Sequence, residues 1–288
     1  MRIRKAVLPV AGLGTRVLPA SKVVPKELLP LVDKPTLQYI VEEAVESGIE
    51  EIIFVTSRSK RSIEDHFDAF PELEQALERK GKHKELDELR RVQTLATYTA
   101  VRQAEPRGLG HAVLCAKELV GDEPFVVMLG DELVAPETPC LPLMIEIYEK
   151  YGGSVLSLFT SPPELIPSYG IASVNELDPN TVQVTHLVEK PPLEEAPSDL
   201  AVAGRYILTP DIFALLEKTQ PGRGGEIQVT DAIEQQAQAG RCYGLRFSGI
   251  RYDTGNPLGL LTTSIAYALK RPDIAPALRD YMREALTQ

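Results

Sequence analysis

The amino-acid sequence predicts an α/β fold with a mixed, mainly parallel central sheet flanked by helices and a smaller antiparallel part in its second half. Residues 5–56 contain a strand, a loop, a helix and a second strand in that order, which is the βαβ unit of parallel sheets. From about residue 170 onward, short strand-like segments alternate with turns rich in Pro, Asn and Gly, a pattern typical of antiparallel pairing.

Hydrophobic spacing defines the elements of the βαβ unit. Residues 5–10 are a short apolar run that predicts a buried strand, and residues 51–56 predict a second one. In residues 36–47 the apolar side chains recur at i, i+3, i+4, i+7 and i+8, which predicts a helix closed by Gly48.

The later elements follow from the same spacing rules. Further strands are expected at 97–103, 125–129, 154–159, 171–175, 181–188, 201–208 and 243–247. Further helices are expected at 112–119, 141–151, 211–218, 227–239, 258–269 and 277–286. Residues 72–91 are highly charged, have leucines at helical spacing and are broken at Gly81, so they predict a mostly exposed helical insertion. No linker or internal repeat divides the chain, and we expect one domain.

Composition excludes several classes of protein. The 288 residues carry a net charge of -10, which disfavours nucleic-acid and anionic-membrane binding. No apolar run approaches the ~18 residues needed to span a bilayer. The three cysteines are far apart and form no C-x-x-C motif, so neither a disulfide framework nor a zinc site is indicated. We therefore expect a protein of the reducing cytoplasm.

The first loop departs from the acidic average. Residues 1–26 contain six bases and no acid, and the loop after the first strand reads Ala-Gly-Leu-Gly-Thr-Arg at 11–16. The loop is not a P-loop, and Val17 replaces the third glycine of a dinucleotide-binding motif, which disfavours a nicotinamide cofactor. Two glycines followed by Arg16 and Lys26 suit a nucleoside triphosphate. Taken alone, a G-x-G loop is more often a tight structural turn than a phosphate-binding loop.

Several separated motifs together resemble the sugar-1-phosphate nucleotidylyltransferase superfamily. The first runs from Gly12 to Arg16 and continues through Pro19, the PKELLP of 25–30 and the DKP of 33–35. The others are RQAEPRGLGHA at 102–112, GD at 130–131, VEKP at 188–191, GGEIQVTDA at 224–232 and YDTG at 252–255. The likeness spans about residues 4–271, and the insertion before residue 103 favours the uridylyl branch over the shorter thymidylyl branch. Two positions depart from it, Pro257 where relatives often carry a lysine and Gly130 where some carry another acid.

The resemblance implies a Rossmann-like fold of the nucleotide-diphospho-sugar transferase type in one domain. Residues of about 1–135 would form a nucleotide-binding half, 136–255 a sugar-phosphate-binding half with antiparallel strands, and 256–288 C-terminal helices. The implied reaction joins UTP and glucose 1-phosphate to give UDP-glucose and pyrophosphate with Mg²⁺ as cofactor. A homo-oligomer, either a dimer or a tetramer, is implied as well, and the C-terminal helix is a candidate for its interface.

The resemblance also assigns roles to individual residues. The implied catalytic residues are Arg16, Lys26, Asp131 and Lys190. The implied nucleotide contacts are Ala11, Gly12, Gly14, Thr15, Glu27, Gln103 and Gly108, and the implied sugar contacts are Gly170, Glu189, Lys190 and Gly204. Asp131 and Asp253 are the implied metal ligands. Gln103 is the candidate for base selection, because a side-chain amide both donates and accepts hydrogen bonds.

Simpler interpretations stay open for some of these residues. Glu189 and Lys190 also fit an exposed ion pair, Asp253 a turn-capping carboxylate, and Lys22 a solvated surface lysine. Glu132 is expected behind the site or facing solvent, and the four histidines are expected to have structural or surface roles.

Two other functions stay open besides uridylyl transfer to glucose 1-phosphate. The first keeps the fold but uses dTTP or another sugar 1-phosphate, because base selection depends mainly on Gln103. The second is a non-catalytic protein that binds a nucleotide sugar. The presence of Arg16, Asp131 and Lys190 together counts against it, because binding alone does not need the whole set.

Overall fold

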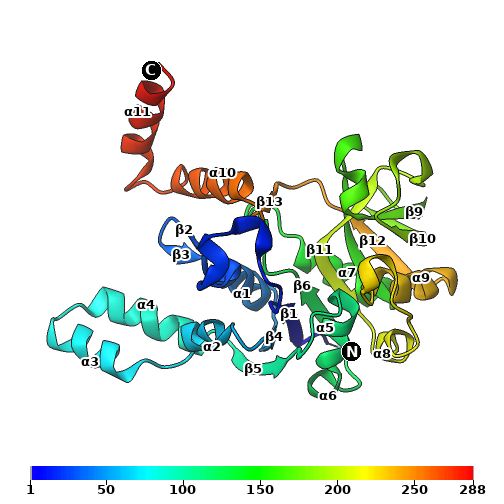
Figure 1. The fold of residues 1–288 in the computed structure, drawn as a ribbon, viewed down its shortest axis with the longest axis horizontal. Coiled ribbons are helices and arrows are strands. Elements are labelled where there is room, and N and C mark those ends of the chain that lie inside the picture. Colours follow the sequence, from blue (N-terminus) through cyan, green and yellow to red (C-terminus); the bar gives the residue numbers. More distant parts are fainter. Residues whose placement is uncertain (1, 288) are drawn as a thin grey trace.

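The computed structural model describes residues 2–287, and its centre is a nine-stranded mixed sheet (Figure 1). The strand order is β5-β4-β1-β6-β11-β8-β12-β10-β9. The strands are β1 (Lys5–Pro9), β4 (Glu51–Thr56), β5 (Thr97–Arg102), β6 (Phe125–Met128), β8 (Ser154–Thr160), β9 (Gly170–Glu176), β10 (Thr181–Glu189), β11 (Leu200–Leu208) and β12 (Cys242–Arg246). Two short ribbons lie outside this sheet, β2 (Pro30–Leu31) with β3 (Lys34–Pro35) and β7 (Glu132–Val134) with β13 (Arg251–Asp253). The mixed α/β architecture expected from the sequence is confirmed.

In the parallel half of the sheet, the inner strands β1, β4 and β6 are buried on both faces, whereas the edge strand β5 has no buried residue. β1 pairs in parallel with β4 and β6, and β4 pairs in parallel with β5. Along β1, Ala6 and Leu8 pack into one core and Val7 into the other. The first core includes side chains of α1 (Thr36–Glu46), α2 (Arg61–Phe67) and α7 (Leu141–Tyr151). The second includes side chains of α5 (Leu109–Cys115), α6 (Lys117–Val120), α8 (Ile212–Leu216) and α9 (Val229–Gln238). Burial on both faces explains why β1, β4 and β6 are largely continuous apolar runs.

The second half of the sheet is mainly antiparallel. β11 runs antiparallel to β6 and β8, and β10 runs antiparallel to β12 and β9, whereas β12 is parallel to β8. Ile171 of β9 also pairs with Ala201 of β11. Strands β11, β8, β12, β10 and β9 therefore close on themselves and form one wall of the site described below.

Two helical arms project from the body (Figure 1). One consists of α3 (Pro71–Arg79) and α4 (His83–Thr94), and it confirms the predicted helical insertion with its break at residue 81. The other consists of α10 (Pro257–Ala268) and α11 (Ala275–Ala285). α10 begins at Pro257, and Asn256 caps it by accepting a hydrogen bond from the Gly259 amide. Within residues 2–287 no helix is long and apolar enough to cross a membrane.

Several element boundaries differ from those expected. The expected helix at 112–119 begins at Leu109 and is divided into α5 and α6 at Ala116. The ribbon β7–β13 and helix α2 were not predicted, because two- or three-residue strands have no period to detect and α2 buries only Ile63 and Phe67. The first loop contains three short 3-10 turns, Thr15–Val17, Ala20–Lys22 and Lys26–Leu28.

Candidate active site

The carboxyl ends of the four parallel strands bring distant motifs to one edge of the sheet. Residues 10–16 follow β1, residues 57–60 follow β4, Gln103 follows β5 and Asp131 lies just beyond β6. A cavity of about 680 Å³ lies between this edge and the closed antiparallel half. Of the expected site residues, those that line it are Arg16, Asp131, Gly170, Glu189, Lys190 and Asp253. The others, which do not line it, are Ala11, Gly12, Gly14, Thr15, Lys26, Glu27, Gln103, Gly108 and Gly204.

Asp131 is the meeting point of the basic first loop and the sheet. Its carboxylate oxygen Oδ2 lies 2.5 Å from Lys26 Nζ and 3.6 Å from Arg16 Nη2. Lys26 and Asp131 are both mostly buried, whereas the side chain of Arg16 is 63 % exposed. Gly130 precedes Asp131, and a Cβ at residue 130 would lie 3.0 Å from Val10 Cγ1 and 3.1 Å from Glu27 Cγ. A side chain at residue 130 would therefore require Val10 and Glu27 to shift by a few tenths of an ångström.

Asp253 is held beside Asp131 by the strand that carries it. β13 pairs with β7 so that Asp253 stands opposite Glu132. Both the amide and the hydroxyl of Thr254 donate to the carbonyl oxygen of Asp131, at 2.8 and 2.9 Å. Asp253 Oδ1 accepts a hydrogen bond from the Gly255 amide at 2.8 Å, so the expected turn-capping contact is present. The same carboxylate lines the cavity.

Gly255 lies where three charged groups converge. A Cβ at this residue would be 2.7 Å from Arg16 Nη2, 2.7 Å from Asp131 Oδ2 and 3.0 Å from Asp253 Oδ1. A guanidinium group and two carboxylates from three separated motifs therefore surround one point, and a larger residue there would displace them.

The two carboxylates fit a divalent cation that is bound together with phosphate. Across residues 2–287 no group of three or more His, Cys, Asp or Glu side chains is arranged to hold a metal ion. Mg²⁺ is commonly held by one or two carboxylates, with phosphate oxygens and water completing its octahedral shell. Asp131 and Asp253 both line the cavity and would supply this partial set of ligands.

A buried ion pair that the sequence analysis missed supports the first loop from below. Lys60 Nζ lies 2.5 Å from Glu27 Oε2, and both residues are almost fully buried. Burial raises the pKa of Glu27, although Lys60 opposes this effect, and burial lowers the pKa of Lys60. The Glu27 side chain, expected at the nucleotide, is thus turned into the protein. It anchors the turn that carries Lys26 to the start of α2.

Glu189 and Lys190 lie on the opposite wall of the cavity. Glu189 ends β10 and pairs in register with Gly170 at the start of β9. Its Oε1 lies 2.9 Å from Lys190 Nζ, and its Oε2 accepts a hydrogen bond from Thr230 Oγ1 at 2.6 Å. The simpler ion-pair interpretation is therefore correct about the contact, but Glu189 is only 15 % exposed and faces the cavity. Lys190 has a positive φ of 46°, a conformation that costs energy in non-glycine residues and often marks functional sites.

The two glycines expected at the sugar differ in their surroundings. A Cβ at Gly170 would lie 3.4 Å from Glu189 Oε2, so this glycine borders the cavity. A Cβ at Gly204 would lie 2.8 Å from the Cβ of Leu129, and the Gly204 amide donates to Glu132 Oε2. Gly204 thus packs against the strand end that leads to Asp131 and does not line the cavity.

Glu132 does not face solvent, which corrects one of its two expected positions. Its side chain is 12 % exposed and lies 2.9 Å from Arg251 Nη1, and burial raises its pKa. Arg251 also donates to the Tyr169 hydroxyl at 3.0 Å and stacks on the Phe159 ring, 4.1 Å from its centroid. This chain of contacts connects the Asp131 segment with the wall formed by Tyr169 and Gly170.

The segments 102–112 and 224–232 are bonded to each other beside the cavity. The Ile227 amide donates to the Arg107 carbonyl at 2.8 Å, and the Gly110 amide donates to the Ile227 carbonyl at 2.9 Å. Gly108 has a φ of 99°, and a Cβ there would lie 2.8 Å from the Ile227 carbonyl oxygen. Only glycine fits this close approach. Gln103 is 7 % exposed and donates from Nε2 to the Gly108 carbonyl at 3.1 Å.

The cavity also has polar and aromatic lining residues to which the sequence analysis gave no individual role. They are Ser168, Tyr169, Tyr206, Glu226, Gln228, Thr230 and Asn256. Three of them lie inside the motif GGEIQVTDA, so the motif marked the right segment without indicating which side chains face the cavity.

Comparisons with known proteins agree with this geometry. Residues 5–269 match the family described as nucleotidyl transferase. The chain is 50 % identical over 287 residues to the UTP--glucose-1-phosphate uridylyltransferase of Bacillus subtilis, covering 100 % of this chain and 98 % of that protein. It superposes with a TM-score of 0.91 and 42 % identity on a UTP-bound UGPase from Acinetobacter baumannii, covering 98 % of this chain and 99 % of that one. A UDP-glucose pyrophosphorylase complexed with UDP-glucose gives a TM-score of 0.85 at 43 % identity, covering 94 % of this chain and 100 % of that one.

Proposed function

Since the chain belongs to the nucleotidyl transferase family, we propose that it transfers the uridylyl group of UTP to glucose 1-phosphate and releases pyrophosphate. The observation that carries the proposal is the convergence of Arg16, Asp131 and Asp253 around Gly255 in a cavity whose opposite wall holds Glu189 and Lys190. Relatives at 47 to 50 % identity over nearly the whole chain are named for this reaction.

The chemistry needs positioning and charge more than it needs a catalytic base. The second pKa of a phosphate monoester is about 6, so the attacking oxygen of glucose 1-phosphate is largely ionised at pH 7. This oxygen attacks the α-phosphorus of UTP in line, and the bond to pyrophosphate breaks. Two polyanions must meet and negative charge moves onto the leaving group, so fixed cations supply most of the stabilisation.

Three cations would perform this task. Arg16 would bind the triphosphate and the departing pyrophosphate, with Lys26 beside it at Asp131. Lys190, on the other wall, would hold the phosphate of glucose 1-phosphate. Arg16 and Lys190 line one cavity from separate walls, which supports a reaction that joins two phosphorylated substrates.

Members of this family generally use a divalent metal, and Mg²⁺ is the proposed ion here. Asp131 and Asp253 would hold it. When bound, it would neutralise phosphate charge during the displacement. The hydrogen bonds from Thr254 to the Asp131 carbonyl keep the two acidic segments together.

Substrate selection is assigned to the remaining site residues. The backbone of residues 11–15, with Gly12 and Gly14, would let the nucleotide approach closely, and Gln103 with Gly108 would meet the uracil edge. Glu189 would accept hydrogen bonds from glucose hydroxyls, with Gly170 and Gly204 in the surrounding backbone. The halves 1–135 and 136–255 would thus hold nucleotide and sugar phosphate, and residues 256–288 would contribute to a homo-oligomer, a dimer or a tetramer.

The deciding experiment is a substrate matrix for pyrophosphate release. UTP, dTTP, CTP and ATP are each paired with glucose 1-phosphate, galactose 1-phosphate and N-acetylglucosamine 1-phosphate, with Mg²⁺ and with a chelator. We expect a maximum at UTP with glucose 1-phosphate that the chelator abolishes. A maximum at dTTP or another sugar would reject the substrate assignment, and calorimetric binding of UDP-glucose without turnover would indicate a binding protein.

Two arginine variants test the residue roles in the same assay. Arg16→Ala is expected to lower kcat/KM by about 100-fold or more, because it removes a cation from the transition state. Arg61→Ala is the matched control, since Arg61 is 87 % exposed, pairs with Asp65 and lies outside the cavity lining. Undiminished pyrophosphate release by Arg16→Ala would refute the role given to Arg16.

A further inference from the structure

The side-chain amide of Gln103 has a single orientation that its surroundings dictate. The Gly108 carbonyl oxygen lies 3.1 Å from the amide, and a carbonyl can only accept a hydrogen bond. The amide atom that faces it must therefore be the NH₂ group, Nε2. This assignment follows from the chemistry of the partner, which removes the usual ambiguity between the oxygen and nitrogen of a glutamine.

The same nitrogen determines the protonation of His111. Nε2 of Gln103 also lies 3.0 Å from His111 Nδ1, and an amide nitrogen donates but does not accept. Nδ1 must therefore be the unprotonated ring nitrogen, and the proton belongs on Nε2, which faces Cys115 Sγ at 4.0 Å. Burial and the nearby Arg107 lower the pKa of His111, although Glu105 opposes them, which favours this neutral ring at pH 7.

Both amide hydrogens of Gln103 are thus committed to the protein, one to Gly108 and one to His111. None of the hydrogen bonds among residues 2–287 uses Gln103 Oε1. This oxygen is also absent from the fully buried polar atoms that lack a partner, so it is not sealed inside the protein. Oε1 is therefore the atom of the Gln103 amide that is left to accept a hydrogen bond from a base. Uracil offers the N3–H donor on its pairing edge, whereas cytosine offers an unprotonated N3 that would face the same oxygen.

We propose that His111 is the positioning residue that makes the base site selective for uracil over cytosine, by holding the Gln103 amide so that only its Oε1 is available to the base. The inference rests on the proposed contact between Gln103 and the base. It replaces the structural or surface role expected of His111. Without the acceptor at Nδ1, only Gly108 opposes rotation of the amide, and the rotated amide would present a donor to the cytosine N3.

The test uses two variants of His111 that differ in one property. His111→Phe keeps an aromatic ring but removes the acceptor, and His111→Asn places an amide oxygen close to the position of Nδ1. A hydrogen bond of this kind contributes about 0.5–1.5 kcal/mol, which corresponds to roughly a two- to tenfold effect. His186→Phe is the control, because His186 contacts Glu234 away from the cavity.

The readout is kcat/KM for UTP, dTTP and CTP at saturating glucose 1-phosphate. We expect His111→Phe to lower the UTP-to-CTP ratio by about two- to tenfold, mainly through a higher KM for UTP, and His111→Asn to restore it. The UTP-to-dTTP ratio should not change, because thymine carries the same N3–H. An unchanged UTP-to-CTP ratio in folded His111→Phe, or equal losses in both variants, would overturn the proposal.

Calorimetric binding of UTP and CTP to the same variants separates this inference from the proposed reaction. If the wild-type protein prefers UTP but shows no turnover with any sugar phosphate, the reaction is wrong and the role of His111 is still measured by the binding ratio. If the wild-type protein binds UTP and CTP equally, the inference about His111 is wrong whatever the reaction.

Discussion

Gly12 and Gly255 are both glycines of the site, but different neighbours restrict them. At Gly255 a side chain would collide with Arg16, Asp131 and Asp253. At Gly12 a Cβ would meet no protein atom within 4 Å, and its φ lies outside the left-handed range. The protein itself therefore tolerates a methyl group at residue 12, and only a ligand that approaches the backbone would exclude it.

Gly12→Ala is accordingly expected to separate stability from nucleotide binding. The free energy of unfolding should stay the same or rise by up to about 1 kcal/mol, because alanine restricts the unfolded chain. The KM for UTP should rise about tenfold or more, while the KM for glucose 1-phosphate stays unchanged. Urea denaturation and steady-state kinetics measure the two effects, and an unchanged KM for UTP would place the nucleotide away from residue 12.

Some site residues can be predicted from local sequence, and others cannot. The difference is whether a residue follows a strand end or depends on a partner that is distant in the sequence. Asp131 and Gln103 follow directly from a strand end, so local spacing locates them. Lys60, Thr230 and Arg251 act through partners that lie 33, 41 and 119 positions away. Nothing in the neighbouring sequence marks these pairs, because the sheet topology alone brings them together.

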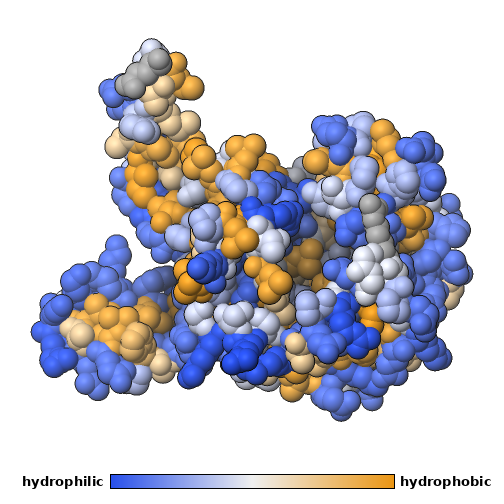
Figure 2. All heavy atoms as spheres, in the orientation of Figure 1, coloured by the Kyte–Doolittle hydropathy of each residue, from blue (hydrophilic) through white to orange (hydrophobic). Residues whose placement is uncertain are grey.

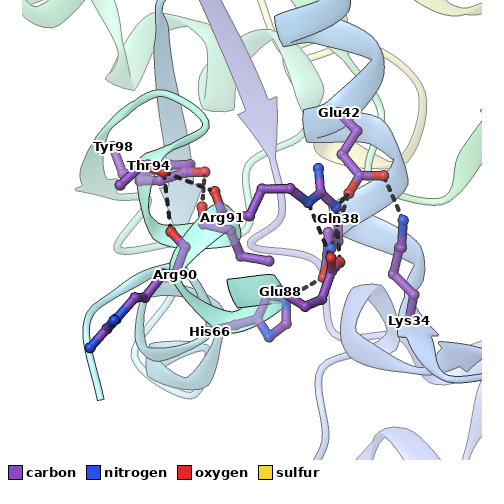
Figure 3. Close-up of polar contacts among 10 residues, drawn as sticks. Lys34, Gln38, Glu42, His66, Glu88, Arg90, Arg91, Thr94 and Tyr98 are labelled. Carbon is purple, nitrogen blue, oxygen red and sulfur yellow. Dashed lines mark hydrogen bonds and ion pairs between the residues drawn. The ribbon is translucent and has the colours of Figure 1, made fainter. Parts of the chain in front are cut away.

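At the scale of elements, a network of polar contacts ties the α3–α4 arm to α1. Glu42 of α1 accepts hydrogen bonds from Lys34 at 2.8 Å, Gln38 at 3.1 Å and Arg91 at 2.6 Å, and Arg91 also binds Glu88 (Figure 3). Burial alone would raise the pKa of Glu42, but these three donors outweigh it and hold the pKa below its ordinary value of 4.5. Arg91 is thus the main link from the arm to the body within this network.

Arg91→Met is expected to loosen the arm without affecting catalysis. Because Arg91 is 44 % exposed, the loss of unfolding free energy should be about 1 kcal/mol or less at pH 7. Amide hydrogen exchange should accelerate in residues 71–94, and kcat/KM should not change, because neither Arg91 nor Glu42 lines the cavity.

The acid dependence of stability supplies the control for this prediction. A carboxylate with a lowered pKa stabilises the fold above its ordinary value of 4.5, and this stability is lost as the pH falls through the folded pKa. Arg91→Met should make this loss of unfolding free energy at low pH smaller. Arg79→Met should not alter it, since Arg79 lies on the same arm and donates to the Gln75 carbonyl. Equal effects of the two variants would show that Arg91 does not anchor the arm through Glu42.

How well an element is predicted depends on how strongly its own sequence determines it. Residues 36–47 have a complete apolar stripe and residues 51–56 an apolar run, and α1 and β4 appear within one residue of the expected limits. β7 and β13 have three residues each and exist only because they pair with each other across the chain. The antiparallel turns were recognisable, but the parallel pairing of β12 with β8 depends on the whole topology.

At the scale of the whole molecule, the C-terminal arm carries apolar side chains that the chain does not cover. Leu258 is 70 % exposed and Leu261 is 59 % exposed on α10, and Tyr281 is 68 % exposed on α11. Figure 2 shows hydrophobic residues along this arm, beyond the compact body. Contiguous apolar surface is costly in water, and in folded proteins it commonly marks an interface.

The proposed homo-oligomer gives this surface an occupant, a second copy of the chain, and leads to a prediction about its mass. Wild-type protein at micromolar concentration should have the mass of a dimer or a tetramer in light scattering coupled to gel filtration. Leu258→Ser with Leu261→Ser should lower that mass, because burying two leucines contributes about 1.5–3 kcal/mol each.

The matched control is Leu177→Ser with Leu193→Ser. These two leucines are less exposed, at 43 and 48 %, and lie far from α10 in the sequence. A monomeric wild type would refute the oligomer, whereas an unchanged mass in the α10 variant would assign the interface to another surface. If the α10 variant becomes monomeric and retains its kcat/KM, each chain holds a complete site, as expected from a cavity lined within one chain.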